Sequence, residues 1–210
     1  KRQGDLKGDH AISLNAKKTT AAELTRYDGI FLSSESLTKY VEKKCLHHKL
    51  TTINPIMGKV LRDPIKDQTA HPFTVAFMGG TFREEVFYST IVPALLKLSL
   101  EREVRVITPP PARECFQVSE RVIKQLHWEY LPRSLSLELY LHQINLYCID
   151  VVVHCGPILE NNRYKTENML INATQIGAVL VSSKNGQIFS DAIKNGAAFS
   201  VENEPDKWYR

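Results

Sequence analysis

Residues 161–183 read NNRYKTENMLINATQIGAVLVSS, and this run indicates how the rest of the chain is built. A polar turn leads into a segment with one apolar face, then to Gly177 and a hydrophobic stretch. The pattern is typical of a helix that ends at a glycine and is followed by a buried strand. The first N–H groups of such a helix lack intrahelical partners, so the turn before it is a candidate anion site. We interpret it as a site for a phosphate and a sugar ring.

The same alternation of short hydrophobic strands and amphipathic helices continues along the chain. Strands are predicted at 29–33, 50–54, 73–78, 104–107, 127–131, 150–154, 178–183 and 197–201. Further helices are predicted at 20–27, 37–47, 84–100, 118–126, 134–147 and 188–195. Ser34 or Ser36 is expected to cap the helix over 37–47, and Pro93 to kink the helix over 84–100. This order predicts an α/β fold, a parallel sheet with helices on both faces.

The chain is expected to have two parts. Residues 56–71 are rich in Pro, Gly, Asp and Lys and are interpreted as a linker. They would separate a lead-in segment, residues 1–55, from the main domain, residues 72–210. Because the sequence opens on Lys1 and not on Met, we expect a piece of a longer protein.

The composition excludes several classes of protein. Hydrophobic residues make up 43% of the chain, with no run of about 18 apolar residues, so no membrane span is expected. The net charge of +4 is scattered and forms no dense basic stripe, which speaks against nucleic-acid binding and favours a cleft for a small anion. The four cysteines lack the close spacing of a zinc site and are expected to be reduced thiols of a cytoplasmic protein.

The first candidate site is the loop after the strand at 73–78. Gly79 and Gly80 would let backbone N–H groups approach a phosphate, and Arg83 could bind its oxygens through two N–H groups. The structural alternative is a tight turn that needs glycine for a positive φ angle. The sequence leaves both interpretations open.

Two further candidate loops follow the strand at 150–154. His154 is interpreted as a packed residue at the strand end or as a site residue, and Glu160 as a solvated or ligand-facing carboxylate. On a helix, Lys165, Asn168 and Asn172 would share one face, because they are spaced three and four residues apart. The alternative is that the two amides cap neighbouring backbone groups. There is no nucleophile elbow for a Ser-His-Asp set.

Much of the sequence resembles a known family. Residues from about Pro72 to Arg210 resemble the nucleotide-sugar-binding C-terminal domain of GT-B glycosyltransferases of the retaining, group-1 type. The resemblance rests on the Gly79-Gly80 loop with Arg83, and on 172–177, Asn-Ala-Thr-Gln-Ile-Gly, the counterpart of a Glu-Ala-x-x-x-Gly helix. Residues before Pro72 resemble the tail of the companion N-terminal domain. Where the family has a lysine after the loop arginine, this chain has Glu84 and Glu85.

The resemblance implies a Rossmann-like fold and a donor site. The residues that it assigns to donor binding are Gly79, Gly80, Arg83, Glu160, Tyr164, Lys165, Thr166, Asn168 and Asn172. The two donor-binding glutamates of the family fall on Tyr164 and Asn172, while an alternative register pairs Glu160 with Asn168.

The implied reaction is glycosyl transfer from a nucleotide-diphosphate sugar to an acceptor hydroxyl, in bacterial polysaccharide or glycan synthesis. It needs no metal and no further cofactor. The acceptor would bind through the N-terminal domain, so this piece alone is expected to be inactive. Peripheral membrane association of the full-length protein stays open. Two rival interpretations are a non-catalytic nucleotide-sugar-binding or scaffold domain, and a nucleotide-sugar epimerase, which would need acidic and histidine catalysts.

Overall fold

The computed structural model describes residues 22–24, 26–44, 49–53, 71–131, 136–156, 167–184 and 189–210. The strands are β1 Ile30–Leu32, β2 Leu50–Thr52, β3 Phe73–Phe77, β4 Val104–Thr108, β5 Glu129–Tyr130, β6 Val151–His154, β7 Val179–Ser183 and β8 Ala198–Val201. The α-helices are α2 Glu35–Lys43, α3 Thr81–Val86, α4 Val92–Leu98, α5 Glu120–Gln125, α6 Leu137–Asn145, α7 Asn168–Gln175, α8 Ser190–Lys194 and α9 Pro205–Tyr209. A π-helical segment, Phe87–Ile91, joins α3 to α4, and a 3-10 turn lies at Glu114–Phe116.

The chain divides into two compact units, Lys1–Pro55 with Arg163–Thr166, and Ile56–Asn162 with Glu167–Arg210. The second unit is built on a six-stranded sheet in the order β5-β4-β3-β6-β7-β8, and every pair of neighbouring strands is parallel. In chain order this is 3-2-1-4-5-6, the arrangement of a doubly wound Rossmann sheet. The predicted α/β parallel sheet is therefore confirmed. Apart from His71, the predicted linker lies outside the described residues.

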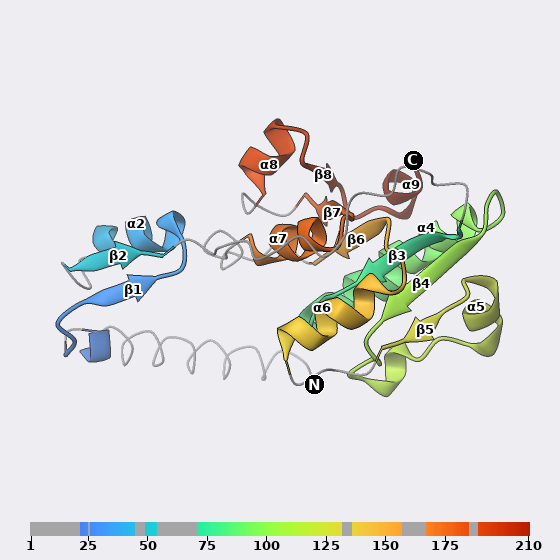
Figure 1. The fold of residues 1–210 in the computed structure, drawn as a ribbon, viewed down its shortest axis with the longest axis horizontal. Coiled ribbons are helices and arrows are strands. Elements are labelled where there is room, and N and C mark those ends of the chain that lie inside the picture. The colour runs from blue at the N-terminus through green and yellow to red at the C-terminus, as the bar shows by residue number, and fades with distance from the viewer. Residues whose placement is uncertain are drawn as a thin grey trace, which may run out of the picture. The chain divides into compact units, whose positions relative to one another are not determined.

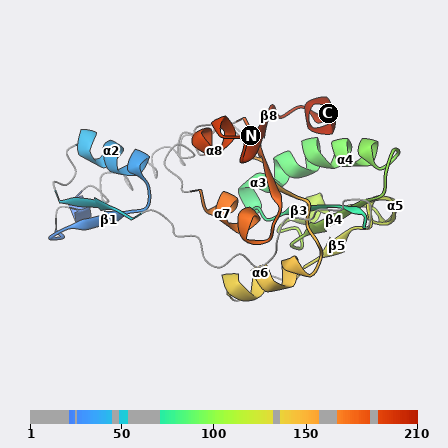
Figure 2. The ribbon, with the colours of Figure 1, turned by 45° about the horizontal axis from the view of Figure 1, so that its top comes forward.

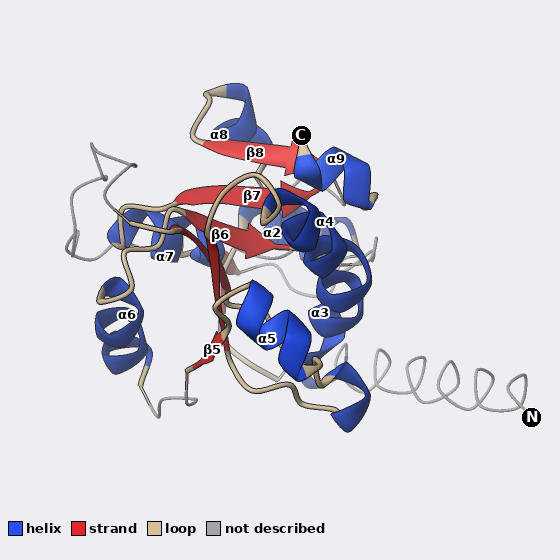
Figure 3. Cartoon of the chain, turned by 90° about the vertical axis from the view of Figure 1, so that its right-hand side faces the viewer, coloured by secondary structure: helices blue, strands red, loops and turns tan. Residues whose placement is uncertain are grey.

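Helices cover both faces of this sheet (Figure 1). Figure 3 shows α6 and α7 on one side of the sheet and α4, α5 and α9 on the other. One apolar core lies beneath α6, α7 and α8 and includes Ile144, Ala173 and Leu180, all almost fully buried. The other lies beneath the π-helical segment, α4 and α5 and includes Phe87 and Val106. Figure 2 shows the same layers near β3 and β4, with α4 and α6 on opposite sides. Burial on both faces explains why the central strands are mostly hydrophobic and do not alternate.

The helix and strand of the opening stretch form as predicted. α7 ends at Gln175, and Gly177 adopts a φ of 67°, a left-handed conformation that favours glycine. The N–H of Ala178 donates to the carbonyl of Ala173 at 2.9 Å, which closes the helix end before β7 begins. In the described chain α7 begins at Asn168, so Asn168 and Asn172 lie on it, and Lys165 falls outside the described residues.

The predicted helix over 84–100 differs from the structure in a way that Pro93 explains. The helical segment begins earlier, at Thr81, and its middle, Phe87–Ile91, is π-helical. Pro93 stands in the first turn of α4, directly after that segment. A proline has no N–H to donate to the preceding turn, and a π-helical widening accommodates this loss within one continuous helix.

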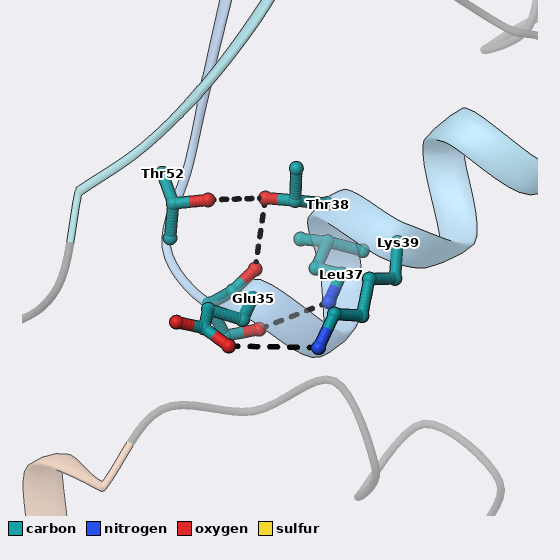
Figure 4. Close-up of polar contacts among 6 residues, drawn as sticks. Glu35, Leu37, Thr38, Lys39 and Thr52 are labelled. Carbon is teal, nitrogen blue, oxygen red and sulfur yellow. Dashed lines mark hydrogen bonds and ion pairs between the residues drawn. The ribbon is translucent and has the colours of Figure 1, made fainter.

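The first unit contains a two-stranded parallel sheet, β1 paired with β2, and the helix α2. Ser34 caps α2, since its hydroxyl accepts from the N–H of Leu37 at 3.2 Å. Thr38 joins the helix to the sheet through a 2.7 Å hydrogen bond between its hydroxyl and that of Thr52 (Figure 4). Of the two serines predicted as caps, the structure uses Ser34. In neither unit does a described helix have the length and apolarity needed to cross a membrane.

Candidate functional site

The strand order reverses between β3 and β6. The chain adds β4 and β5 on one side of β3, and then β6, β7 and β8 on the other. Phe77 of β3 pairs with Val153 of β6, so the loops that follow these two strands leave the sheet side by side. In doubly wound sheets the loops at such a reversal point separate and leave room for a ligand. Two candidate loops of the sequence, at Gly79 and at His154, therefore meet here.

Arg83 connects these two loops. Its Nη1 donates to the carbonyl oxygen of Cys155 at 3.1 Å and lies 3.5 Å from Nδ1 of His154. A guanidinium has no acceptor, so Nδ1 of His154 must be the accepting nitrogen in the latter contact. Burial lowers the pKa of Arg83 from its ordinary value, against an opposing effect of Cys155. The arginine predicted from the sequence is thus half-buried and fixed between the loops after β3 and β6.

Cys155 adds a second hydrogen bond between the two loops. Its thiol donates to the carbonyl of Arg83 at 3.7 Å, and the side chain is fully buried. Burial raises the pKa of Cys155 to about 12, more than the nearby Arg83 lowers it. A thiol with so high a pKa is protonated at neutral pH and is a poor nucleophile. Cys155 therefore has a structural role.

His154 is packed at the strand end, which is one of its two predicted interpretations. The side chain is buried, and its ring meets Phe189 edge to face with a centroid distance of 5.1 Å. Its contact with Arg83 is the link to the candidate site. His154 thus orients Arg83 and has little access to a ligand.

The two glycines of the first loop serve different purposes. Neither has a positive φ, so the alternative of a turn that requires one is wrong. A Cβ atom on Gly79 would lie 2.4 Å from the ring of Phe77, which itself stacks on Phe87 with centroids 4.2 Å apart. Gly79 is therefore required by packing. A Cβ atom on Gly80 would meet nothing within 4 Å, so open space lies in front of this residue, at the position just before α3.

The residues after β6, β7 and β8 are held together by Gly156, which belongs to the candidate loop after His154, and by Ser183 and Asn203, which the sequence interpretation missed. The N–H of Gly156 donates to the hydroxyl of Ser183 at 3.1 Å, and that hydroxyl donates to the side-chain oxygen of Asn203. The amide nitrogen of Asn203 in turn donates to the carbonyl of Gly156 at 3.0 Å. Ser183 stands at the end of a predicted strand, which was the signal available in the sequence. Asn203 had none, because it lies beyond the last predicted strand.

Glu84 is another residue whose role appears only in the structure. It is 1% exposed, and both its carboxylate oxygens accept from the N–H of Ala112, at 3.0 and 3.2 Å. Ala112 follows the proline run at the end of β4. Glu84 therefore anchors the loop after β4, on the other side of β3 from Arg83.

The third candidate segment is only partly described. Glu160, Tyr164, Lys165 and Thr166 lie outside the described residues. Asn168 is exposed as the first residue of α7, and Asn172 is half-buried one turn later. In the described part of the chain, no hydrogen bond connects either amide to Arg83.

Two carboxylates approach each other near the starts of α7 and α8. Burial and the negative charge of Asp191, in that order, raise the pKa of Glu167. Glu167 immediately precedes α7, and Asp191 lies in the first turn of α8, where it pairs with Lys194 at 3.8 Å. Within the described ranges, no group of three or more His, Cys, Asp or Glu side chains is placed to hold a metal ion.

Comparison with solved structures agrees with this architecture. A glycosyltransferase from Rickettsia africae ESF-5 is similar with a TM-score of 0.56 and 12% identity, over 86% of this chain and 51% of that one. The structure of TarM is similar with a TM-score of 0.55 and 15% identity, over 90% of this chain and 36% of that one. The fold is glycosyltransferase-like. The predicted GT-B type of Rossmann-like sheet is thereby supported.

This chain corresponds to only part of the structures that it resembles. It spans about half the length of the rickettsial structure and about a third of TarM. No family model matches the sequence, and no curated protein matches it.

Proposed function

We propose that this chain contributes the donor-binding domain of a GT-B glycosyltransferase and binds a nucleotide-diphosphate sugar at the crevice between β3 and β6. The observation that carries the proposal is the position of Arg83. It is held by Cys155 and His154 at the point where the strand order reverses. Gly80, three residues earlier, faces open space into which a phosphate could enter. A fixed guanidinium beside an open backbone position is suited to a diphosphate.

The guanidinium retains donors for a ligand. Within the described part of the chain, its hydrogen bonds use Nη1 alone. Because a guanidinium carries five N–H donors in a rigid plane, Nε and Nη2 can bind phosphate oxygens while Nη1 keeps its protein contacts. The charge that develops on the leaving diphosphate would be stabilised by Arg83 and by backbone N–H groups near Gly80, without a metal.

Sugar and ribose recognition would come from the connection between β6 and α7. This connection carries Glu160, Tyr164, Lys165 and Thr166 and leads to Asn168 and Asn172. Gly156, two residues after β6, and Glu167, the residue before α7, flank this connection. An amide at position 172 can hydrogen-bond to ribose hydroxyls, although a carboxylate would bind them more strongly.

The remaining parts of the proposal concern the whole protein. The domain would be the C-terminal half of a retaining, group-1 type enzyme, and a companion N-terminal domain would bind the acceptor hydroxyl. The product would be a bacterial polysaccharide or another glycan made in the cytoplasm. The 210 residues alone would bind donor weakly and transfer little.

The test is a calorimetric and thermal-shift titration with UDP, GDP, ADP and CMP and their sugar conjugates. A ligand of the folded state adds about 2.7 kcal/mol of stability at a hundredfold excess over its Kd. We expect one nucleoside diphosphate to stabilise the chain, and Arg83→Ala to remove most of that effect. The matched control is Arg121→Ala, an exposed arginine of α5. A failure of every nucleotide to bind the wild-type chain would overturn the proposal.

A non-catalytic binding or scaffold domain is the second candidate, and one observation favours it. The positions that correspond to the two donor-binding glutamates hold Tyr164 and Asn172. Asn172→Glu separates the candidates. In a working site it changes the affinity for the sugar conjugate relative to the bare diphosphate. In a scaffold it changes neither.

A further inference from the structure

One peptide group, which joins Cys155 to Gly156, lies at the centre of the contacts around Arg83. Its carbonyl oxygen, on Cys155, accepts from Nη1 of Arg83 at 3.1 Å. Its N–H, on Gly156, donates to the hydroxyl of Ser183 at 3.1 Å. A trans peptide group is planar, and its C=O and N–H point in opposite directions. A side chain that orients the N–H therefore also orients the carbonyl that holds Arg83.

This peptide group lies just beyond the sheet. The last residue of β6 is His154, which pairs with Ser182 of β7. Cys155 and Gly156 follow it and are both buried. A buried backbone group outside a strand ladder needs partners from side chains or water. Arg83 and Ser183 supply them here, one for each end of the peptide, and together they fix its orientation.

Ser183 is itself oriented by Asn203. The serine side chain is buried, and its hydroxyl donates to the side-chain oxygen of Asn203. A hydroxyl has one proton, so a hydroxyl that donates to Asn203 presents its lone pairs to the N–H of Gly156. The amide nitrogen of Asn203 also donates to the carbonyl of Gly156 at 3.0 Å. Asn203 thus fixes the direction in which Ser183 accepts.

The hydrogen bond at one end of the peptide strengthens the bond at the other end. When the N–H of Gly156 donates to Ser183, the carbonyl oxygen of Cys155 becomes more negative and accepts more strongly. That oxygen meets the cationic guanidinium of Arg83, and hydrogen bonds of a charged donor are about twice as strong as neutral ones. Ser183 therefore acts on Arg83 through both the direction and the strength of this contact.

We propose that Ser183, oriented by Asn203, is a positioning residue of the donor site. It holds the peptide between Cys155 and Gly156 so that the guanidinium of Arg83 is fixed before a diphosphate binds. The proposal rests on the proposed function, because it takes Arg83 as the group that binds the diphosphate. A guanidinium that is already in place loses less conformational freedom on binding, so the ligand binds more tightly.

Ser182 provides a matched control for Ser183. It is a buried serine of the same strand, and its hydroxyl donates to the carbonyl of Phe199 at 3.3 Å. Successive side chains of a strand point to opposite faces of the sheet, so the hydroxyls of Ser182 and Ser183 lie on different sides. Replacement of either serine by alanine removes one buried hydroxyl from β7, but only Ser183→Ala removes the acceptor of the Gly156 N–H.

The first experiment observes Arg83 without a ligand, by NMR of isotope-labelled arginine side chains, with Arg83→Lys to assign its signals. We expect the wild type and Ser182→Ala to show separate Nη1 protons that exchange slowly with water. Ser183→Ala should lose these signals, and Ser183→Thr, which keeps the hydroxyl, should restore them. Circular dichroism shows that each variant is folded. Signals of Arg83 that remain unchanged in Ser183→Ala overturn the proposal.

The second experiment measures binding of inorganic pyrophosphate by calorimetry. Ser183→Ala should weaken binding by about 3- to 10-fold, and Ser182→Ala should leave it unchanged. In an Arg83→Ala background, Ser183→Ala should cause no further loss, because its effect passes through Arg83. Asn203→Ala, at an exposed position, should weaken binding in the same direction and serves as the test if Ser183→Ala does not fold.

The two experiments distinguish failure of this role from failure of the proposed function. An equal loss of pyrophosphate affinity on Ser183→Ala with and without Arg83 overturns the positioning role, even where nucleotides bind. If the Arg83 signals depend on Ser183 but the wild type binds neither pyrophosphate nor a nucleoside diphosphate, the proposed function is wrong, and Ser183 has no part in a donor site.

Discussion

Arg83 and Cys155, 72 residues apart in the sequence, are joined by two reciprocal hydrogen bonds from side chain to backbone. The guanidinium of Arg83 donates to the backbone carbonyl of Cys155 at 3.1 Å, and the thiol of Cys155 donates to the backbone carbonyl of Arg83 at 3.7 Å. The pair joins the loop after β3 to the loop after β6, across the reversal point of the sheet. The candidate anion-binding side chain is thus positioned before any ligand arrives, which is how a binding site reduces the cost of ordering its groups.

Two replacements of Arg83 should show how much of the nucleotide affinity depends on its charge and how much on the planar shape of the guanidinium. Arg83→Ala removes the charge and leaves the carbonyl of Cys155 without its donor, so we expect nucleoside diphosphate affinity to fall by about 10- to 100-fold. Arg83→Lys retains the charge but not the planar fork and should recover part of the affinity. Calorimetric Kd values for the two variants and for Arg121→Ala test this. An Arg83→Ala Kd equal to that of the wild type would remove Arg83 from the site.

The two loop glycines should respond in opposite ways to the same substitution. Gly79→Ala forces a Cβ atom against the ring of Phe77 and should cost about 1–3 kcal/mol of unfolding free energy. Gly80→Ala projects into open space and should change stability by less than about 1 kcal/mol. If a phosphate approaches Gly80, this second variant should weaken nucleotide binding. Urea unfolding and titration of both proteins provide the comparison, and a reversed order of stability would contradict the packing argument.

Asn203 should stabilise the chain through its hydrogen bonds to the Ser183 hydroxyl and the Gly156 carbonyl. Asn203→Ala removes the amide that donates to the carbonyl of Gly156 and the oxygen that accepts from the hydroxyl of Ser183, and should cost about 1–3 kcal/mol. Asn195→Ala is the control, because Asn195 is an exposed amide at the end of α8. Equal unfolding midpoints for the two variants in urea would show that the three-residue network contributes little.

The buried thiol of Cys155 should make stability depend on alkaline pH. Its pKa is raised from 9.0 to about 12, so the folded chain keeps the proton at pH values where the unfolded chain releases it. The contribution is complete below pH 9 and is lost as pH rises towards 12, at a rate of up to about 1.4 kcal/mol per pH unit. We expect the stability difference between the wild type and Cys155→Ala to shrink over this range. Urea unfolding at pH 8, 9 and 10 measures it, and a constant difference would argue against the raised pKa.

The same burial predicts unequal reactivity of the cysteines. In native protein at pH 8, a thiol reagent should modify the exposed Cys115 rapidly and leave Cys155 intact. Peptide mapping after short exposure identifies the modified residue. Modification of both thiols at the same rate would indicate that the loop after β6 opens easily.

Local features of the sequence were sufficient to predict most of the helices and strands. The left-handed glycine at position 177 and the serine cap at position 34 act within a few residues, so a reader of the sequence can place these helix ends. The hydrophobic run at 150–154 predicts a strand buried on both faces for the same reason. The course of the helix near Pro93 was less predictable, because a proline can either kink a helix or be accommodated by a π-helical segment.

The sequence by itself determined the alternation of strands and helices, and with it a parallel α/β sheet, because both periodicities are properties of neighbouring residues. Only the tertiary structure decided which loops meet. The strand order brings Arg83 to Cys155, buries Glu84 under the loop after β4, and joins Asn203 to Gly156. Such contacts connect segments about 30 to 70 residues apart, and their energies depend on burial that no local pattern encodes.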